Sequence, residues 1–336
     1  MHVKAVISLN YSLFRVITQP CKMKIIDRLE NIQTPFANAV ITIGNFDGVH
    51  IGHQALFHEV IEKAEAIQGT AIAMTFEPHP MRVLKQNNHP PLITIYEHKK
   101  ELIERSGIDV LICVPFTKKF AALTAEEFIK DLLIKKIGMK AIVVGKDYTF
   151  GKNREGNLAV LKSYADQMGY EVIVAEWIKA AHNLPDRISS TRVRELLMDG
   201  EIETARKMLG RHYQIRGLVV KGRDRGGKLL GIPTANINLQ DELCPKTGIY
   251  AVTVEHQQRL YRGVANIGYS PTFNDNEFTV EVHILDFDEN IYDRKIRVNF
   301  IERIRDEKRF DGIDALKNQI HQDIEAARKI LAAYEK

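Results

Sequence analysis

Apolar residues in the first 210 positions follow two alternating patterns. Short continuous apolar runs, typical of strands buried on both faces, occupy positions 39–43, 71–76, 110–114, 141–144 and 171–175. Between them lie segments with apolar residues at helical spacing, at positions 52–68, 96–106, 124–137 and 158–168. Strands separated by helices predict an α/β fold, a doubly wound parallel sheet covered on both faces.

After Arg211 the pattern changes to short strands bounded by turn residues. These strands are predicted at positions 213–220, 249–255, 261–267, 278–286 and 295–304. Successive short strands favour an antiparallel β-barrel. Near the C-terminus, apolar residues three or four positions apart from Ile313 to Leu331 predict a long amphipathic helix on the barrel. We therefore expect an N-terminal extension (1–22), a first domain (23–209) and a second domain (210–336).

Composition places the chain among ordinary globular proteins. Hydrophobic residues make up 45% and charged residues 27% of its 336 positions. The net charge is +4, too small to indicate a nucleic-acid partner. No apolar run predicts a membrane helix. The three cysteines are odd in number and far apart, which fits a reducing compartment and predicts a cytoplasmic location: Cys21, Cys113 and Cys244.

The most informative segment is GNFDGVHIGH at positions 44–53, where the first strand gives way to the first helix. Glycines let the backbone approach a ligand, and helix amides point at an anion. His50 and His53 are suited to donate hydrogen bonds to a transferring phosphate. The residues expected around that phosphate are Gly44, Asn45, Phe46 and Gly52. Packing histidines and a zinc site are alternatives, although no third zinc ligand is evident.

Three more segments follow strands or open a helix, on the edge where doubly wound sheets bind ligands. They are TFEPHP (75–80), GKDYTFG (145–151) and ISSTRVR (188–194). Each also has a structural interpretation, as a strand-end turn, a loop aspartate or an ordinary helix cap. The expected roles are a magnesium or hydroxyl contact for Glu77, a flavin or metal contact for Asp147, an aromatic contact for Phe150, and phosphate contacts for Ser190, Thr191 and Arg194.

The barrel half carries a second group of candidate residues. GRDRGGK at 222–228 nearly matches a P-loop, but Leu229 replaces the required Ser or Thr and no helix follows. Gly222 and Lys228 remain candidates for phosphate contacts. In LGIPTAN (230–236), Thr234 and Asn236 offer two oxygen ligands for Mg²⁺ and ATP phosphates. Glu281 lies between two valines that point to the opposite face of their strand, so it is either a proton acceptor or one partner of a surface ion pair.

These motifs resemble those of one family. GNFDGVHIGH resembles the HIGH-type signature of nucleotidyltransferases and, more narrowly, of bacterial FAD synthetases. GIPTAN is similar to the riboflavin kinase signature, and residues 23–336 as a whole resemble the bifunctional riboflavin kinase/FAD synthetases. The resemblance implies that riboflavin and ATP give FMN and ADP in the second domain. It also implies that FMN and a second ATP give FAD and pyrophosphate in the first.

The same resemblance implies Mg²⁺ for both reactions and Glu281 as the catalytic glutamate of the kinase. Two rival functions are disfavoured. A nucleotidyltransferase for another phosphorylated acceptor would not need the GIPTAN half, and a non-catalytic flavin sensor would be expected to lose the histidines or Glu281, which are all present. Ser270 and Lys228 depart from the family pattern and put phosphate-contact details in question. The sequence indicates neither a protein partner nor an oligomeric state. Residues 1–22 match nothing in the family, and Met23 is a candidate start whose upstream segment is expected to be dispensable.

Overall fold

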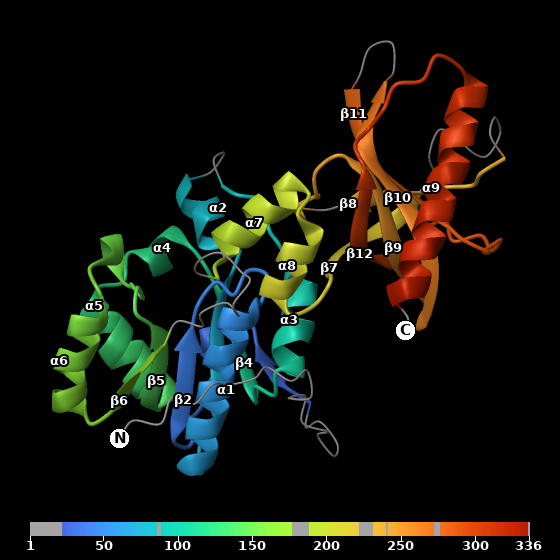
Figure 1. Ribbon diagram of the computed structural model, residues 1–336. Coiled ribbons are helices and arrows are strands. Elements are labelled where there is room, and N and C mark those ends of the chain that lie inside the picture. The colour runs from blue at the N-terminus through green and yellow to red at the C-terminus, as the bar shows by residue number, and fades with distance from the viewer. Residues whose placement is uncertain are drawn as a thin grey trace, which may run out of the picture.

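A six-stranded sheet forms the centre of the N-terminal half of the computed structural model (Figure 1). The structure describes residues 22–85, 89–176, 188–221, 231–239, 241–271 and 276–334. Neighbouring strands of the sheet are all parallel, in the order β1–β4–β3–β2–β5–β6. Their bounds are β1 Lys24–Ile26, β2 Ala39–Ile43, β3 Ala71–Glu77, β4 Val110–Pro115, β5 Met139–Gly145 and β6 Glu171–Ala175. The predicted parallel sheet is confirmed, and the short β1 was not predicted.

Helices connect these strands, as the apolar spacing predicted. They are α1 Ile51–Ala66, α2 Pro80–Lys85, α3 Tyr96–Arg105, α4 Lys118–Ala121, α5 Ala125–Glu127, η2 Phe128–Ile137 and α6 Leu158–Met168, with short 3₁₀ turns η1 Leu29–Asn31 and η3 Lys152–Arg154. A capping box opens α5, because Thr124 and Glu127 each accept a hydrogen bond from the other's backbone amide. The continuous helix predicted over 124–137 instead becomes π-helical at η2. Apolar spacing does not distinguish these two hydrogen-bonding patterns.

The strand order reverses beside β2, which determines where a ligand can bind. From β2 the chain proceeds to β3 and β4 on one side, and then to β5 and β6 on the other. The carboxyl ends of β2 and β5 therefore border the crevice that doubly wound sheets use for ligands. The GNFDGVHIGH loop follows β2, and Asp147 follows β5.

The C-terminal half is a closed barrel in the order β10–β11–β8–β7–β12–β9, with antiparallel pairing throughout. The strands are β7 Tyr213–Val220, β8 Ala235–Leu239, β9 Gly248–His256, β10 Arg259–Pro271, β11 Asn276–Ile284 and β12 Lys295–Arg305. The barrel and five of its strands were predicted, whereas β8 was not. The predicted terminal helix is α9 (Ile313–Tyr334), and its Ala327 and Leu331 pack on the outside of the barrel (Figure 1).

Two helices, α7 (Ser190–Asp199) and α8 (Ile202–Leu209), lie between the sheet and the barrel (Figure 1). Their apolar residues share one buried cluster with the barrel interior. Polar contacts also join the halves. Glu101 of α3 accepts two hydrogen bonds of 2.8 Å from Arg216 of β7 and one of 3.1 Å from Arg297 of β12. The backbone of Leu92 pairs with the segment that follows β8. The two halves therefore dock through specific contacts.

Candidate active sites

The loop after β2 has an unusual backbone conformation. Phe46, Gly48 and Val49 have φ angles of 47°, 83° and 40°, in a region that costs energy for residues other than glycine. Gly44 is also constrained, because a Cβ there would lie 2.8 Å from the Phe46 ring. Surrounding contacts therefore have to hold this turn in place.

His50 and His53 lie together at the start of α1. The His50 Nδ1 accepts a 3.3 Å hydrogen bond from the His53 backbone amide, so His50 is the N-cap of the helix. The two rings stack, with centroids 3.6 Å apart. Gly52 permits this arrangement, since a Cβ there would lie 3.1 Å from the His50 ring. Because Nδ1 accepts, the Nε2 of a neutral His50 carries the proton and is a hydrogen-bond donor.

Both imidazoles are neutral at pH 7. Burial lowers the pKa of His50 to about 4, and the nearby charges of Arg211 and Arg194 act in the same direction. Burial also lowers the pKa of His53 well below its ordinary value, with His50, Lys99 and Arg211 contributing. The pair is therefore suited to donate hydrogen bonds and not to carry positive charge before a ligand binds.

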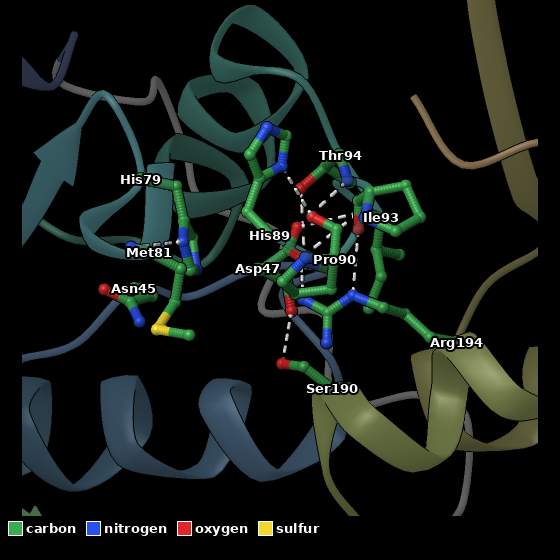
Figure 2. Close-up of polar contacts among 12 residues, drawn as sticks. Asn45, Asp47, His79, Met81, His89, Pro90, Ile93, Thr94, Ser190 and Arg194 are labelled. Carbon is green, nitrogen blue, oxygen red and sulfur yellow. Dashed lines mark hydrogen bonds and ion pairs between the residues drawn. The ribbon is translucent and has the colours of Figure 1, made fainter. Parts of the chain in front are cut away.

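Asp47 connects this loop to two other segments (Figure 2). Its carboxylate is buried and accepts hydrogen bonds from the Ile93 and Thr94 amides at 3.0 and 3.1 Å. It also forms a 2.5 Å ion pair with Arg194. The Asp47 carbonyl accepts a 2.8 Å hydrogen bond from the Ser190 hydroxyl. Charge-assisted contacts of this kind fix the loop against the start of α7.

The residues predicted at the start of α7 therefore lie next to the GNFDGVHIGH loop. Some of them already make hydrogen bonds or an ion pair within the protein. Arg194 donates through Nε to the Pro91 carbonyl at 2.9 Å, in addition to its pair with Asp47. Ser189 caps the helix by accepting from the Arg192 amide. Thr191 is exposed on the first turn. The start of α7 therefore has an ordinary cap, Ser189, and an exposed side chain, Thr191, that a phosphate can reach.

Glu77 lies at the end of β3, near a buried lysine. Lys99 is 5% exposed, and its Nζ donates to the Asn45 carbonyl at 3.3 Å. Thr75 donates to the same carbonyl at 3.2 Å. Burial raises the pKa of Glu77 and lowers that of Lys99, while the attraction between their charges opposes both shifts. Thr75 and Lys99 therefore both hold the Asn45 backbone of the motif in place.

His79, in the same segment, has a local role. Its Nδ1 accepts a 3.2 Å hydrogen bond from the Met81 amide, as Figure 2 shows. Burial lowers its pKa to about 4. His79 therefore stabilises the start of α2 in its neutral form.

Phe150, expected to contact an aromatic ligand, lies mostly inside the first half. This residue is only 7% exposed, and its ring packs against Phe128 and Tyr148 in the core of the first half. A side chain so enclosed has little surface left for an aromatic ligand. Asp147 lies in the turn between Gly145 and Tyr148, at the carboxyl end of β5. Of these two, Asp147 is the one at the ligand-binding edge.

A row of polar residues crosses three strands on the outside of the barrel. Glu281 of β11 is directly opposite Asn236 of β8 on one side and Asn266 of β10 on the other. The flanking Val280 and Val282 are buried in the barrel interior, so Glu281 lies on the opposite, outer face of the strand. Burial raises the pKa of the half-buried Glu281. Within the described ranges no cation pairs with it, so this part of the structure offers no partner for the ion-pair alternative.

The neighbouring His283 organises the segment that leads into β8. A ring nitrogen of His283 lies 2.7 Å from the Pro233 carbonyl, which immediately precedes Thr234. Because His283 and Glu281 share one face of β11, Thr234 enters β8 close to the Asn236–Glu281 row. Gly222 and Lys228 lie outside the described residues.

Comparisons with known proteins match two successive parts of the chain to two families. A FAD synthetase family model matches residues 32–192, and a riboflavin kinase model matches residues 209–331. The bifunctional riboflavin kinase/FMN adenylyltransferase of Buchnera aphidicola subsp. Schizaphis graminum is 36% identical over 91% of this chain and 98% of its own length. That of Escherichia coli K12 is 38% identical over 91% of this chain and 97% of its own. The chain belongs to the family of bifunctional riboflavin kinase/FMN adenylyltransferases. It is therefore a transferase with both kinase and nucleotidyltransferase functions.

The architecture is shared as well. A crystal structure of a Streptococcus pneumoniae protein named as a macrolide-efflux protein superposes with a TM-score of 0.81. It is 36% identical to this chain and aligned over 91% of this chain and 98% of its own. Within the described ranges, no helix combines the length and the apolar character needed to cross a membrane. The parallel sheet and barrel of this riboflavin kinase/FMN adenylyltransferase thus recur together in a relative.

Sequence reasoning missed several residues around the two sites. Asp47 lies inside GNFDGVHIGH, so its position in that motif was the available signal, and Asn266 is found only through its pairing with Glu281. Lys99 and Arg211 lie outside every motif, and only the folded contacts bring them to the histidine loop. The family signature therefore marks the loop but not all of the groups that hold it.

Proposed function

We propose that each half of this riboflavin kinase/FMN adenylyltransferase carries one reaction. The barrel transfers the γ-phosphoryl group of ATP to the 5′-hydroxyl of riboflavin, which gives FMN and ADP. The sheet half transfers AMP from a second ATP to FMN, which gives FAD and pyrophosphate. The observation that carries this division is the separation of the stacked His50–His53 pair from the Asn236–Glu281 row, on two different folds.

In adenylyl transfer, an FMN phosphate oxygen attacks the α-phosphorus of ATP and pyrophosphate leaves. The Nε2 of neutral His50, together with His53, donates hydrogen bonds to phosphate oxygens as charge develops on them. Gly44, Asn45, Phe46 and Gly52 shape the loop around the phosphates. The amides at the start of α1 face the same anion.

At the start of α7, Ser190, Thr191 and Arg194 contact the pyrophosphate portion of ATP. Asp47 holds the Arg194 guanidinium from one side, which orients its remaining donors. Glu77 and Asp147 lie at the ends of β3 and β5, on the edge where the flavin or its phosphate has to enter. We assign the flavin contacts of this site to these two carboxylates, and Phe150 acts as core support.

In riboflavin phosphorylation, Glu281 accepts the proton of the 5′-hydroxyl while that oxygen attacks the γ-phosphorus. The raised pKa of Glu281 makes the carboxylate a better proton acceptor near neutral pH. Thr234 and Asn236 contact the ATP phosphates from the neighbouring strand, and Gly222 and Lys228 are assigned to the same phosphates from the preceding segment. Asn266 extends the row on the other side of Glu281.

The residues around Glu281 also fit a magnesium ion. The Thr234 hydroxyl, the Asn236 amide and the Glu281 carboxylate are oxygen donors, the ligand type that Mg²⁺ prefers. Thr234 and Asn236 would hold the ion, which would neutralise charge on the ATP phosphates. We propose a cytoplasmic location, in keeping with the free thiols of Cys113 and Cys244.

The direct test is to incubate the protein with riboflavin, ATP and MgCl₂ and to separate the products by chromatography. FMN should form first and FAD should follow. Supplied FMN should give FAD and pyrophosphate without riboflavin. Formation of neither FMN nor FAD would contradict the proposed function.

Removing residues 1–22 should leave both activities intact. The truncated chain keeps Met23, which is buried in the core of the first half and 4% exposed. It also keeps every residue assigned to either reaction. Both half-reactions should therefore run within about twofold of the full chain. A large loss of either one in the shortened protein would show that the segment contributes.

Acid should destabilise the fold below about pH 6.5. In the folded protein, burial lowers the pKa of His50 to about 4, of His79 to about 4 and of His98 to about 2. The unfolded chain binds protons on these residues near pH 6.5, so the stability present above that pH is lost as the pH falls toward 4. Thermal unfolding followed by fluorescence at pH 7 and pH 4.5 should show a clearly lower Tm in acid.

A matched pair of variants tests the cause of the acid effect. His50→Asn keeps a helix cap and removes one buried imidazole, so it should flatten the pH dependence of Tm. His58→Asn removes an exposed histidine that is paired with Glu62, and it should leave the pH dependence of Tm unchanged. Equal pH dependence in wild type and His50→Asn would argue against the buried histidine as a cause.

A further inference from the structure

Arg211 lies at the junction of the two halves. It follows α8 and Gly210, whose φ of 70° turns the chain toward β7. The riboflavin kinase model, residues 209–331, includes it, whereas the FAD synthetase model ends at residue 192. By sequence, Arg211 therefore belongs to the kinase half.

The side chain of Arg211 nevertheless reaches back to the adenylylation loop. Its Nη2 donates to the Gly48 carbonyl at 2.7 Å, and its Nη1 lies 3.3 Å from the Val49 carbonyl and 3.3 Å from the Leu209 carbonyl. Gln54 reinforces the connection, because its Nε2 donates to the Val49 and Leu209 carbonyls at 2.9 and 3.0 Å. Two side chains thus clamp the loop to the end of α8.

The loop carbonyls that these side chains hold, those of Gly48 and Val49, belong to the part of the turn with the unusual backbone conformation. Gly48 and Val49 both have positive φ angles, and His50 follows directly. A strained turn persists only where its surroundings hold it. If the carbonyl bonds were lost, the turn could relax and carry His50 and its stacked partner His53 with it.

We propose that Arg211 is a positioning residue for adenylyl transfer, supplied by the kinase half to the loop that presents His50 and His53. The inference rests on the proposed role of these histidines. Arg211 does not touch the reacting phosphorus; it acts by fixing the backbone that precedes them. The adenylylation site is then complete only when the start of the kinase half is docked against it.

A conservative series on the full chain tests the proposal. Arg211→Met keeps an extended apolar side chain and removes both the charge and the hydrogen bonds. Arg211→Lys keeps the charge, but a single ammonium does not reproduce the planar fork that bonds the two loop carbonyls, of Gly48 and Val49. Arg206→Met is the matched control, because Arg206 in α8 pairs with Glu203 at distances of 2.6 and 2.8 Å.

The kcat of FAD formation from FMN should fall by roughly 10²-fold in Arg211→Met, the scale expected when catalytic groups are displaced by about 1 Å. Arg211→Lys should lie between this variant and wild type. The KM values for ATP and FMN should change far less than kcat. Riboflavin phosphorylation should stay near normal in all three variants, and Arg206→Met should keep both reactions.

Near-normal FAD formation in Arg211→Met would overturn the proposal. So would equal loss of both half-reactions together with a lower Tm, because that result describes a purely structural residue. If Arg211→Met does not fold, Arg211→Lys decides, since full adenylylation in that variant would overturn the need for the two-carbonyl clamp. Failure of the wild-type protein to convert FMN to FAD would instead contradict the proposed function, so the two failures are distinguishable.

Discussion

Replacing Glu281 with Gln should lower riboflavin phosphorylation by roughly 10²–10⁴-fold, the range for a positioned general base. The amide has the same shape but does not take up a proton at neutral pH. Because the deficit lies in the transition state, riboflavin binding should change little. FAD formation from supplied FMN should continue, since that chemistry is assigned to His50 and His53 in the other half. FAD formation from riboflavin should collapse, because it has to pass through FMN.

The two half-reactions of Glu281→Gln should be measured separately by chromatography. Glu302→Gln is a matched control, because Glu302 is an exposed glutamate on another barrel strand, β12. It should leave both reactions unchanged. A surface ion pair involving Glu281 would contribute only about 0–1 kcal/mol to stability and would leave kinase turnover near normal. Normal FMN production by Glu281→Gln would remove this residue from the mechanism.

Loss of either histidine should give the reciprocal result. His53→Ala should slow FMN-to-FAD conversion by roughly 10²-fold or more, the scale for one preorganised donor. His50→Asn should do the same, and Asn is preferable to Ala at this position because it can still cap α1. Riboflavin phosphorylation should be nearly unchanged, because both residues lie in the sheet half.

The rate of FAD formation at several pH values gives a second readout for the histidines. Because burial lowers the pKa of His50 to about 4, the wild-type rate should not fall through protonation of this pair between pH 8 and pH 6. A loss centred near pH 6.5 that disappears in His50→Asn would contradict the neutral-donor assignment. Equal loss of both half-reactions in the histidine variants would contradict the division of labour.

The fold was largely predictable because its elements have strong local signals. The strands β2 and β6 were predicted at the residues where they occur, since each is a short, mainly apolar run next to a helix or turn. The strand β8, which pairs with β7 and β11, was not predicted, although Asn236 and Asn238 alternate with its apolar residues as in a strand with one buried face. The π-helical η2 has the same apolar spacing as an α-helix, so the pattern did not reveal it.

The candidate sites were predictable only where a motif contained the residues. His50 and His53 are three positions apart in sequence, and the start of α1 brings them together. Arg211 is more than 150 positions from Gly48, so their contact depends on how the two halves dock. The burial of Phe150 was likewise not predictable, because the motif places an aromatic residue near the sheet edge and only the fold shows that its ring packs into the core. Long-range contacts and burial of this kind are not encoded in any short pattern.

The central claim, that two separate sites carry successive reactions, is tested most directly by mixing two variants that each lack one of the two activities. His53→Ala should convert riboflavin to FMN and stop, and Glu281→Gln should convert only supplied FMN to FAD. Mixed in equal amounts with riboflavin, ATP and MgCl₂, they should produce FAD, because FMN released by one chain can be used by the other. A mixture that forms FMN but no FAD, although Glu281→Gln still converts supplied FMN, would contradict the account.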